Sequence, residues 1–374
     1  MAITSLHLQH GGVEMAISLL ANALCEKGFQ VQILCTYNLG EPAYPLDPRV
    51  QVRYLTQDQP NREAFQQALH HKNPIGILRE GLRAVGILRR KKRTMIQAIS
   101  SISTGTILST RNEHSVLLSR YGQPGVKKVA QLHHDHLFDP KLIEDFQKHY
   151  EHIDYLALLV PQLTQEVQEF MKGHNTHTQC ITIGNFLKED PCPTSPIQRE
   201  NQVIAVGRLH PDKGFDRLLQ IWSQVAPTHP EWTLRIIGEG PLRGALEQQC
   251  QDLGIQNSVQ LPGALPHDQV MQEMSHSAIY AMTSVSEGFP FVLIEAMACA
   301  LPIVAYDVRV GPGALIQNEH NGILVPDNQT ELFAQQLSRL MDQTSLRTQM
   351  GQAGREKSKE YLQDHVLEQW LSIL

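Results

Sequence analysis

Two cationic side chains share one short segment near the middle of the chain. Arg208 and Lys213 lie between an apolar run at residues 203–206 and a helical pattern that begins at Phe215. Because both cations lie on one loop, they could converge on a single anion. A forked guanidinium beside an ammonium suits a diphosphate. The alternative interpretation is that they are two solvated loop charges.

Two glutamates flank a second segment that changes from loop to helix. Gly288 follows Glu287 and allows the chain to turn, and Phe289 is followed by Pro290, which suits the first position of a helix. Glu295 then falls in the early turns of that helix beside apolar residues, so its carboxylate needs a partner. A ribose diol offers two O–H donors. A salt bridge to a buried arginine is the alternative.

Two adjacent glycines stand near the N-terminus. Gly11 and Gly12 come where an apolar run at residues 3–8 gives way to a helical pattern. Glycine lets a ligand approach the backbone, and the free N–H groups at the start of a helix bind phosphates or sugar hydroxyls. A tight turn without a ligand explains the pair as well. The chain has no G-x-G-x-x-G segment, which counts against a nicotinamide or flavin cofactor.

A group of titratable residues follows the apolar run at residues 126–132, namely His133, His134, Asp135 and His136. Three imidazoles and a carboxylate suggest a metal site, but adjacent residues of an extended chain point to opposite sides and rarely share one ion. We therefore expect no metal here, and we expect Asp135 to fix the tautomer of a histidine. The chain also has no D-x-D pair to hold a divalent ion on a diphosphate, so Arg208, Lys213 and helix N-termini would carry that charge.

Residues 75–99 are strongly basic, with seven Lys or Arg residues against one acid, Glu80. Aliphatic side chains recur there at helical spacing, at Leu78, Leu82, Val85 and Leu88. Such a basic amphipathic helix could dock on anionic lipid headgroups. A helix packed on a sheet, with its basic face in solvent, explains the pattern equally well.

The elements that must position these residues are short apolar runs that alternate with helical patterns along the whole chain. This alternation predicts an α/β fold with parallel sheets covered on both faces. Because 374 residues are too many for one hydrophobic core, we expect two doubly wound, Rossmann-like domains that face each other across a cleft. Three prolines within residues 190–196 resist regular structure and mark the linker.

Composition narrows the class of protein. With 32 basic and 38 acidic residues the formal net charge is -6, so no nucleic-acid partner is expected. The start of the chain shows no secretory signal, and the most apolar stretch, residues 289–306, contains Glu295 and two prolines. The six cysteines form no C-x-x-C pair, and we interpret all of them as reduced. These features predict a cytoplasmic protein.

Together these segments resemble glycosyltransferase family 4, and the resemblance covers nearly the whole chain. Its motifs are Gly-Gly-x-Glu near the start, Gly-Arg-Leu-x-x-x-Lys-Gly-x-Asp in the second half, and Glu287 and Glu295 with seven residues between them. Gly311-Pro312 and residues 321–325 also match. The resemblance implies the GT-B fold, a retaining mechanism and a nucleotide sugar as substrate, with no cofactor and no metal.

The resemblance also implies roles for the matching positions. The backbone at Gly11 and Gly12 would meet the diphosphate or the sugar, Arg208 and Lys213 would neutralise the diphosphate, and Glu295 would bind the ribose. The transferred hexose would be held by Glu287 with the backbone of Gly288, Phe289 and Pro290. A histidine near that sugar matches His133 best and His136 second, so His133 and Glu287 are the expected catalytic residues. Many relatives have an acid where this chain has Ala314, so any hydrogen bond made there is missing or supplied elsewhere.

The implied activity is transfer of a hexose from a nucleotide sugar, with UDP expected as the nucleotide, to a hydroxyl of a glycan, a lipid-linked sugar or a polymer. Such reactions build polysaccharides, glycolipids and cell-envelope glycans. The expected acceptor-binding domain is 1–187 and the nucleotide-sugar-binding domain is 188–374, with a last helix at about 355–374 that returns to the N-terminal domain. Contact with the inner face of the membrane would use residues 75–99. An epimerase or phosphorylase on the same scaffold, and a non-catalytic nucleotide-binding subunit of a glycosyltransferase complex, remain alternatives.

Overall fold

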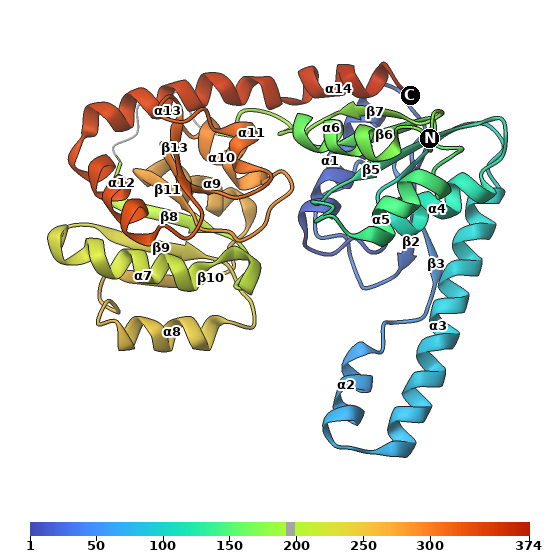
Figure 1. Ribbon diagram of the computed structural model, residues 1–374, viewed down its shortest axis with the longest axis horizontal. Helices are drawn as coiled ribbons and strands as arrows, with labels where there is room; N and C mark the ends of the chain where they lie inside the picture. The colour runs from blue at the N-terminus through green and yellow to red at the C-terminus, as the bar shows by residue number, and fades with distance from the viewer. Residues whose placement is uncertain (192–198) are drawn as a thin grey trace. The chain divides into compact units, whose positions relative to one another are not determined.

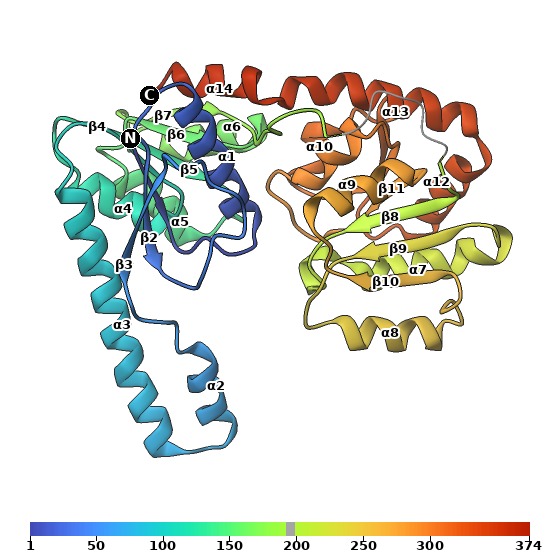
Figure 2. The same cartoon turned by 180° about the vertical axis from the view of Figure 1, so that it is seen from behind.

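The computed structural model describes residues 1–191 and 199–374 and divides the chain into two compact units (Figures 1 and 2). Unit 1 comprises residues 1–159, 163–183 and 369–374, and unit 2 comprises residues 160–162 and 184–368. The division after Ile183 lies close to the expected boundary at 187. Most of the expected linker at 190–196 lies outside the described residues.

Unit 1 is built on a parallel sheet of seven strands in the order β3-β2-β1-β4-β5-β6-β7. The strands are β1 (Ala2–Ser5), β2 (Gln32–Tyr37), β3 (Gln51–Thr56), β4 (Gly105–Ser109), β5 (Val126–Leu132), β6 (Tyr155–Leu158) and β7 (Gln179–Thr182). Ile3, Ile33 and Val129 are fully buried, as expected of strands covered on both faces. The strand order reverses at β1, and such a reversal is where α/β folds bind ligands.

The helices of unit 1 include a long hairpin. Against the sheet lie α1 (Gly12–Glu26) and α4 (Asn112–Tyr121). The other short helices are α5 (Pro140–Glu144), the π-helical turn η1 (Asp145–His149) and α6 (Pro161–Met171). The hairpin consists of α2 (Arg62–His70) and α3 (Pro74–Ser100), and Figure 1 shows α2 and the start of α3 extending away from the sheet. In the described parts of the chain, no helix is both long and apolar enough to span a bilayer.

Unit 2 is built on a parallel sheet of six strands in the order β10-β9-β8-β11-β12-β13. The strands are β8 (Gln202–Val206), β9 (Thr233–Ile237), β10 (Val259–Gly263), β11 (Ile279–Met282), β12 (Ile303–Asp307) and β13 (Gly322–Pro326). Its helices are η2 (Pro211–Lys213), α7 (Phe215–Val225), η3 (Ala226–Thr228), α8 (Arg243–Asp252), α9 (His267–His276), α10 (Phe291–Ala298), α11 (Pro312–Leu315) and α12 (Thr330–Asp342). The prediction of two doubly wound parallel α/β domains is confirmed.

The C-terminal segment differs from the single helix expected at about 355–374. It consists of α13 (Thr344–Ser358), the 3-10 turn η4 (Lys359–Tyr361) and α14 (Gln363–Leu371). Within unit 1, the Thr106 hydroxyl donates a hydrogen bond to the carbonyl of Leu374 at 3.3 Å, and Trp370 is buried. The end of the chain is therefore packed in unit 1.

The cysteines differ from the expectation that all are reduced. Cys25, Cys35, Cys180 and Cys250 are free thiols, and burial raises the pKa of Cys35 and Cys180 to about 12. Cys299 is disulfide-bonded. The expectation is therefore wrong at Cys299, because spacing along a sequence does not show which cysteines approach one another in the fold.

Candidate active site

The strand order of unit 2 reverses at β8. The segment that contains Arg208 and Lys213 and the segment that contains Glu287 both lie at this reversal. Residues 207–214 follow β8 and residues 283–290 follow its neighbour β11. The carboxyl ends of parallel strands lie at one edge of the sheet, so these two loops are adjacent although more than seventy residues separate them.

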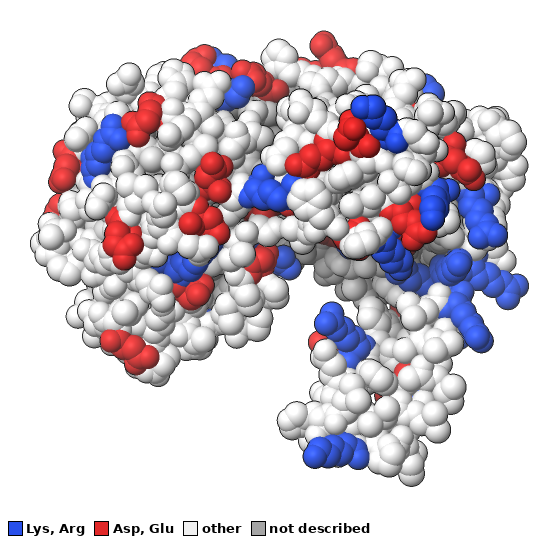
Figure 3. All heavy atoms as spheres, viewed as in Figure 1, with Lys and Arg blue, Asp and Glu red and all other residues white. Residues whose placement is uncertain are grey.

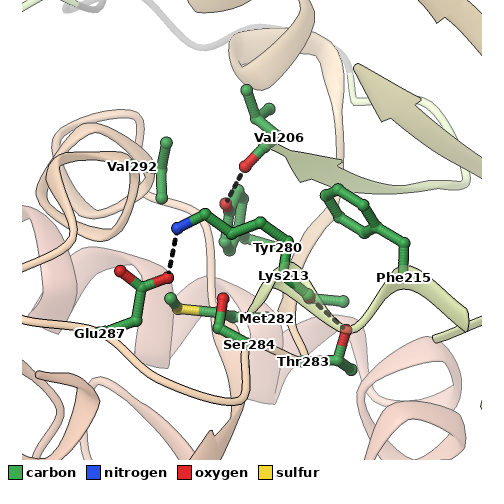
Figure 4. A pocket seen from close by; sticks show the side chains of 10 residues that line it. Val206, Lys213, Phe215, Tyr280, Met282, Thr283, Ser284, Glu287 and Val292 are labelled. Atoms are coloured by element: carbon green, nitrogen blue, oxygen red, sulfur yellow. Dashed lines mark hydrogen bonds and ion pairs between the residues drawn. The ribbon is translucent and has the colours of Figure 1, made fainter. Parts of the chain in front are cut away.

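Lys213 and Glu287 form an ion pair between these two loops. The Lys213 Nζ donates to the Glu287 Oε1 at 2.7 Å, and the two side chains are 20% and 9% exposed. Figure 4 shows the pair beside a small pocket whose other lining residues include Val206, Tyr280 and Ser284. The sequence predicted that both residues act on the donor, and the structure places them in direct contact.

Arg208 lies on the same loop but points to a different partner. Its side chain is 69% exposed, and its guanidinium lies 3.8 Å from the Asp212 carboxylate. That carboxylate also contacts His210 Nδ1 at 2.5 Å. The structure therefore leaves Arg208 accessible to an anion, whereas Lys213 is occupied by Glu287.

The residues after Glu287 are held by packing within unit 2. Phe289 is buried against the Tyr361 ring, with ring centroids 5.5 Å apart, and its carbonyl accepts a hydrogen bond from Asn185 at 3.1 Å. Pro290 is the N-cap of α10, one residue before the first helical position that was predicted for it. Gly311 has φ +105°, and a Cβ there would lie 2.9 Å from the Glu287 Cβ. The turn at Gly311 therefore packs directly against the loop that contains Glu287.

Glu295 is a buried carboxylate on α10. Its recorded ionic contact is with His267 Nδ1 at 3.7 Å, at the start of α9. Burial raises the pKa of Glu295, and the nearby His267 offsets this only in part. This contact is too long for a hydrogen bond, so the carboxylate oxygens can accept hydrogen bonds from two hydroxyl donors.

Sequence reasoning missed Arg217, which supports the loop after β11. Its guanidinium donates to the carbonyls of Thr283 and Ser284, forms an ion pair with Asp327 at 2.7 Å, and lies 4.5 Å from the Tyr306 ring centroid. Arg217 follows the Lys-Gly-x-Asp motif directly, and nothing in its spacing predicts this contact.

Gly214 fixes the distance between the two loops. It has φ +60°, and a Cβ there would lie 2.1 Å from the Thr283 carbonyl oxygen. We expect Gly214→Ala to lower the free energy of unfolding by about 2–4 kcal/mol, because both the backbone conformation and the contact oppose a side chain. Urea unfolding followed by circular dichroism would measure this loss.

The matched control is Gly244→Ala on α8, where a Cβ would meet no atom within 4 Å. We expect this substitution to be neutral or to stabilise by up to about 1 kcal/mol. Equal unfolding midpoints for the two variants would contradict the argument from loop contact.

In unit 1, Gly11 and Gly12 lie at the N-terminus of α1 after the central strand β1. Gly11 is the N-cap, and no side chain caps the first turn, so N–H groups of that turn remain available to a ligand. The Glu14 carboxylate folds back over Gly11, where a Cβ would lie 2.2 Å from its Oε2. Glu14 in turn contacts Arg111, 3.1 Å away on the loop after β4. The sequence did not predict this pair, in which Glu14 is buried and Arg111 is 33% exposed. It holds the glycine segment in place.

His133 directly follows β5, at the same edge of the unit 1 sheet. Its Nε2 is buried and has no hydrogen-bond partner in the described parts of the chain. Burial lowers the pKa of His133 to about 3, with His134 and Arg111 adding to the shift. The imidazole is therefore neutral at pH 7, and it can share a hydrogen bond with a hydroxyl group.

His136 differs from His133 because both of its ring nitrogens are engaged inside unit 1. Nε2 lies 2.7 Å from the Glu166 carboxylate, and Nδ1 accepts a hydrogen bond from the Phe138 N–H at 3.1 Å. The side chain is buried beside Phe138 and Phe170. Glu166 is thus one partner of the imidazole. Asp135 accepts from the Leu137 N–H, and its role in fixing a histidine tautomer stays a prediction. Within residues 1–191 and 199–374, no three His, Cys, Asp or Glu side chains are grouped so as to hold a metal ion.

The sequence is similar to those of known glycosyltransferases. Residues 190–357 match the sequence model of the family described as glycosyl transferases group 1. The chain is 28% identical over 371 residues to the amylovoran biosynthesis glycosyltransferase AmsD of Erwinia amylovora, with 97% of this chain and 96% of that protein aligned. It is also 28% identical over 391 residues to an exopolysaccharide phosphotransferase of Streptomyces coelicolor, of which it spans only 39%.

The fold of the chain is also similar to that of a solved structure. A TarM mutant of S. aureus, in complex with fondaparinux, alpha-GlcNAc-glycerol and UDP, is similar with a TM-score of 0.76 at 15% identity, over 100% of this chain and 99% of that one. The chain therefore has the GT-B fold and glycosyltransferase homologues, and its residues 190–357 match the glycosyl transferases group 1 family.

Proposed function

We propose that this chain is a retaining glycosyltransferase that moves a hexose from a UDP-sugar to a hydroxyl of a glycan, a lipid-linked sugar or a polymer. The proposed setting is the synthesis of polysaccharides, glycolipids or cell-envelope glycans. The observation that carries the proposal is the Lys213–Glu287 pair at the strand-order reversal of unit 2, with the buried Glu295 carboxylate on the adjacent α10. The glycosyltransferase AmsD, which aligns over almost its whole length, supports it.

In the proposed reaction, Lys213 changes partner when the donor binds. A diphosphate carries more charge than a carboxylate, so it competes for the ammonium that Glu287 holds at 2.7 Å in the free chain. The exposed Arg208 supplies a second cation from the same loop. Glu287 then becomes free to accept hydrogen bonds from hydroxyl groups of the transferred hexose, and Glu295 accepts them from the ribose.

Bond breaking places negative charge on the leaving diphosphate while the sugar becomes oxocarbenium-like. Fixed cations stabilise that charge more in the transition state than in the ground state. We propose attack on the same face of the sugar, with the leaving phosphate oxygen accepting the proton of the acceptor hydroxyl. A neutral His133 would orient a hydroxyl rather than take its proton, because its pKa is about 3.

The test is a donor screen with the full chain. Thermal shift across UDP-, GDP- and ADP-sugars would identify the nucleotide, because a bound ligand raises the apparent stability. Hydrolysis of the matching donor should then be detectable, and Glu287→Ala should abolish it. An epimer, or a sugar phosphate formed when phosphate is added, would instead identify an epimerase or a phosphorylase. Donor binding without any turnover would indicate a non-catalytic subunit.

We also propose that the reaction needs no divalent metal. Arg208 and Lys213 carry the charge that a metal would otherwise carry. Adding EDTA to the donor-hydrolysis assay should therefore change the rate by less than about twofold, compared with the 10²–10³-fold typical of losing a main electrostatic group. A loss of turnover that Mg²⁺ or Mn²⁺ restores would show this proposal to be wrong.

A further inference from the structure

The hairpin of α2 and α3 contains an apolar face that nothing in unit 1 covers. The buried residues in the second half of α3 are Met95, Ala98 and Ile99, and α3 packs there on α4 and β3. In the first half, α2 covers one side of the helix, where the Asn61 amide donates to the Glu80 carbonyl at 2.9 Å. The remaining side faces solvent.

Five large aliphatic residues form this face, which we call the apolar stripe. Their exposed fractions are 79% for Ile75, 66% for Leu78, 67% for Leu82, 45% for Val85 and 59% for Leu88. Spacings of three and four residues align them along one side of the helix. In the described parts of the chain, eleven large apolar residues are exposed, and five of them belong to this stripe. A contiguous patch of this kind marks a binding surface.

Basic residues continue the same row of α3. Arg89, Lys92 and Arg93 follow Val85 and Leu88 at spacings of three to five residues and are exposed, and no acidic partner is recorded for them in the described parts of the chain. Arg79 and Arg83 flank the stripe and contact the buried Glu80 carboxylate at 3.1 Å and 3.7 Å. Figure 3 shows Lys and Arg side chains gathered where the hairpin meets the rest of unit 1, above a mostly uncharged hairpin surface.

We propose that α3 docks on a bilayer that contains anionic lipids, with the apolar stripe at the boundary between headgroups and acyl chains. Arg89, Lys92 and Arg93 would contact lipid phosphates. An apolar face in line with unpaired cations is the pattern that binds such an interface. A soluble polyanion would engage the cations but would leave the stripe in water, so it fits only half of the surface. This proposal does not depend on the proposed glycosyl transfer.

The test is co-sedimentation of the full chain with phosphatidylcholine vesicles, with and without phosphatidylglycerol. We expect binding to the mixed vesicles at low salt and weaker binding at high salt. Leu78→Gln with Leu82→Gln should lower the partition coefficient by at least about tenfold. Arg89→Gln with Lys92→Gln and Arg93→Gln should lower it on the order of 100-fold at low salt.

Matched controls separate this site from general effects of charge and apolar area. Lys148→Gln, Lys172→Gln and Lys359→Gln remove three exposed cations elsewhere, and Phe29→Gln with Leu253→Gln removes two exposed apolar side chains. Both control chains should bind like the wild type, and all variants should melt within a few degrees of it. Absence of binding to the mixed vesicles, or equal loss in the controls, would overturn the proposal. So would a dimer that forms without lipid and is lost in the Leu78→Gln, Leu82→Gln chain, because a second copy would then cover the stripe.

Discussion

Lys213→Ala is expected to lower kcat/KM for sugar transfer by two or more orders of magnitude. The ammonium is held at the strand-order reversal by a 2.7 Å contact with Glu287, and in the proposed reaction it meets the negative charge of the departing diphosphate. Because that charge develops in the transition state, most of the loss should appear in kcat. Steady-state kinetics with the donor found in the screen would measure it.

One control variant and one parallel measurement make this result specific. Lys359→Ala removes an exposed cation from the surface of unit 2 and should leave the kinetics unchanged. Lys213→Ala also leaves the Glu287 carboxylate buried without its cation, so unfolding must be measured in parallel. If Lys213→Ala remains folded and turns over at nearly the wild-type rate, the assignment of Lys213 to the diphosphate is wrong.

The sequence predicted the sheets well because apolar runs with sharp ends coincide with their strands. The apolar run at residues 126–132 coincides with β5, and α7 begins at Phe215 as predicted. The strand β13 was recognised only as a family motif, because it begins at Gly322 and ends at Pro326, two residues that rarely mark a central strand. On this edge strand both are tolerated.

Contacts between distant residues could not be predicted in the same way. Arg111 and Glu14 are 97 residues apart, and they meet only because β1 and β4 are neighbours in the sheet. The helical spacing of Leu78, Leu82, Val85 and Leu88 likewise predicted an apolar row on α3. It did not predict whether other residues cover that row. The structure separates the two halves, since Met95 is buried and Leu82 is 67% exposed. The end of the helix therefore packs on unit 1, as one interpretation of residues 75–99 has it, and lipid docking of the exposed row stays a proposal.

Glu295→Gln is expected to weaken donor binding and to stabilise the fold at neutral pH. Two ribose hydroxyls donating to a carboxylate would be replaced by weaker contacts to an amide, so the Kd for the nucleotide sugar should rise by about 10–100-fold. In the absence of donor, the buried carboxylate has only His267 at 3.7 Å to offset its desolvation. Removing that charge should raise the free energy of unfolding by about 1 kcal/mol at pH 7.

The pH dependence of this gain follows from the direction of the shift. The pKa of Glu295 is raised above its ordinary value of 4.5 on folding. Below 4.5 the carboxyl is protonated in both the folded and unfolded states and imposes no cost. The cost develops as the pH rises above 4.5 and is complete above the folded pKa. In urea unfolding, the extra free energy of unfolding of Glu295→Gln over the wild type should therefore disappear at acidic pH. The exposed control Glu368→Gln should have the wild-type free energy of unfolding at every pH. An advantage that persists in acid would show that packing, and not charge, is responsible.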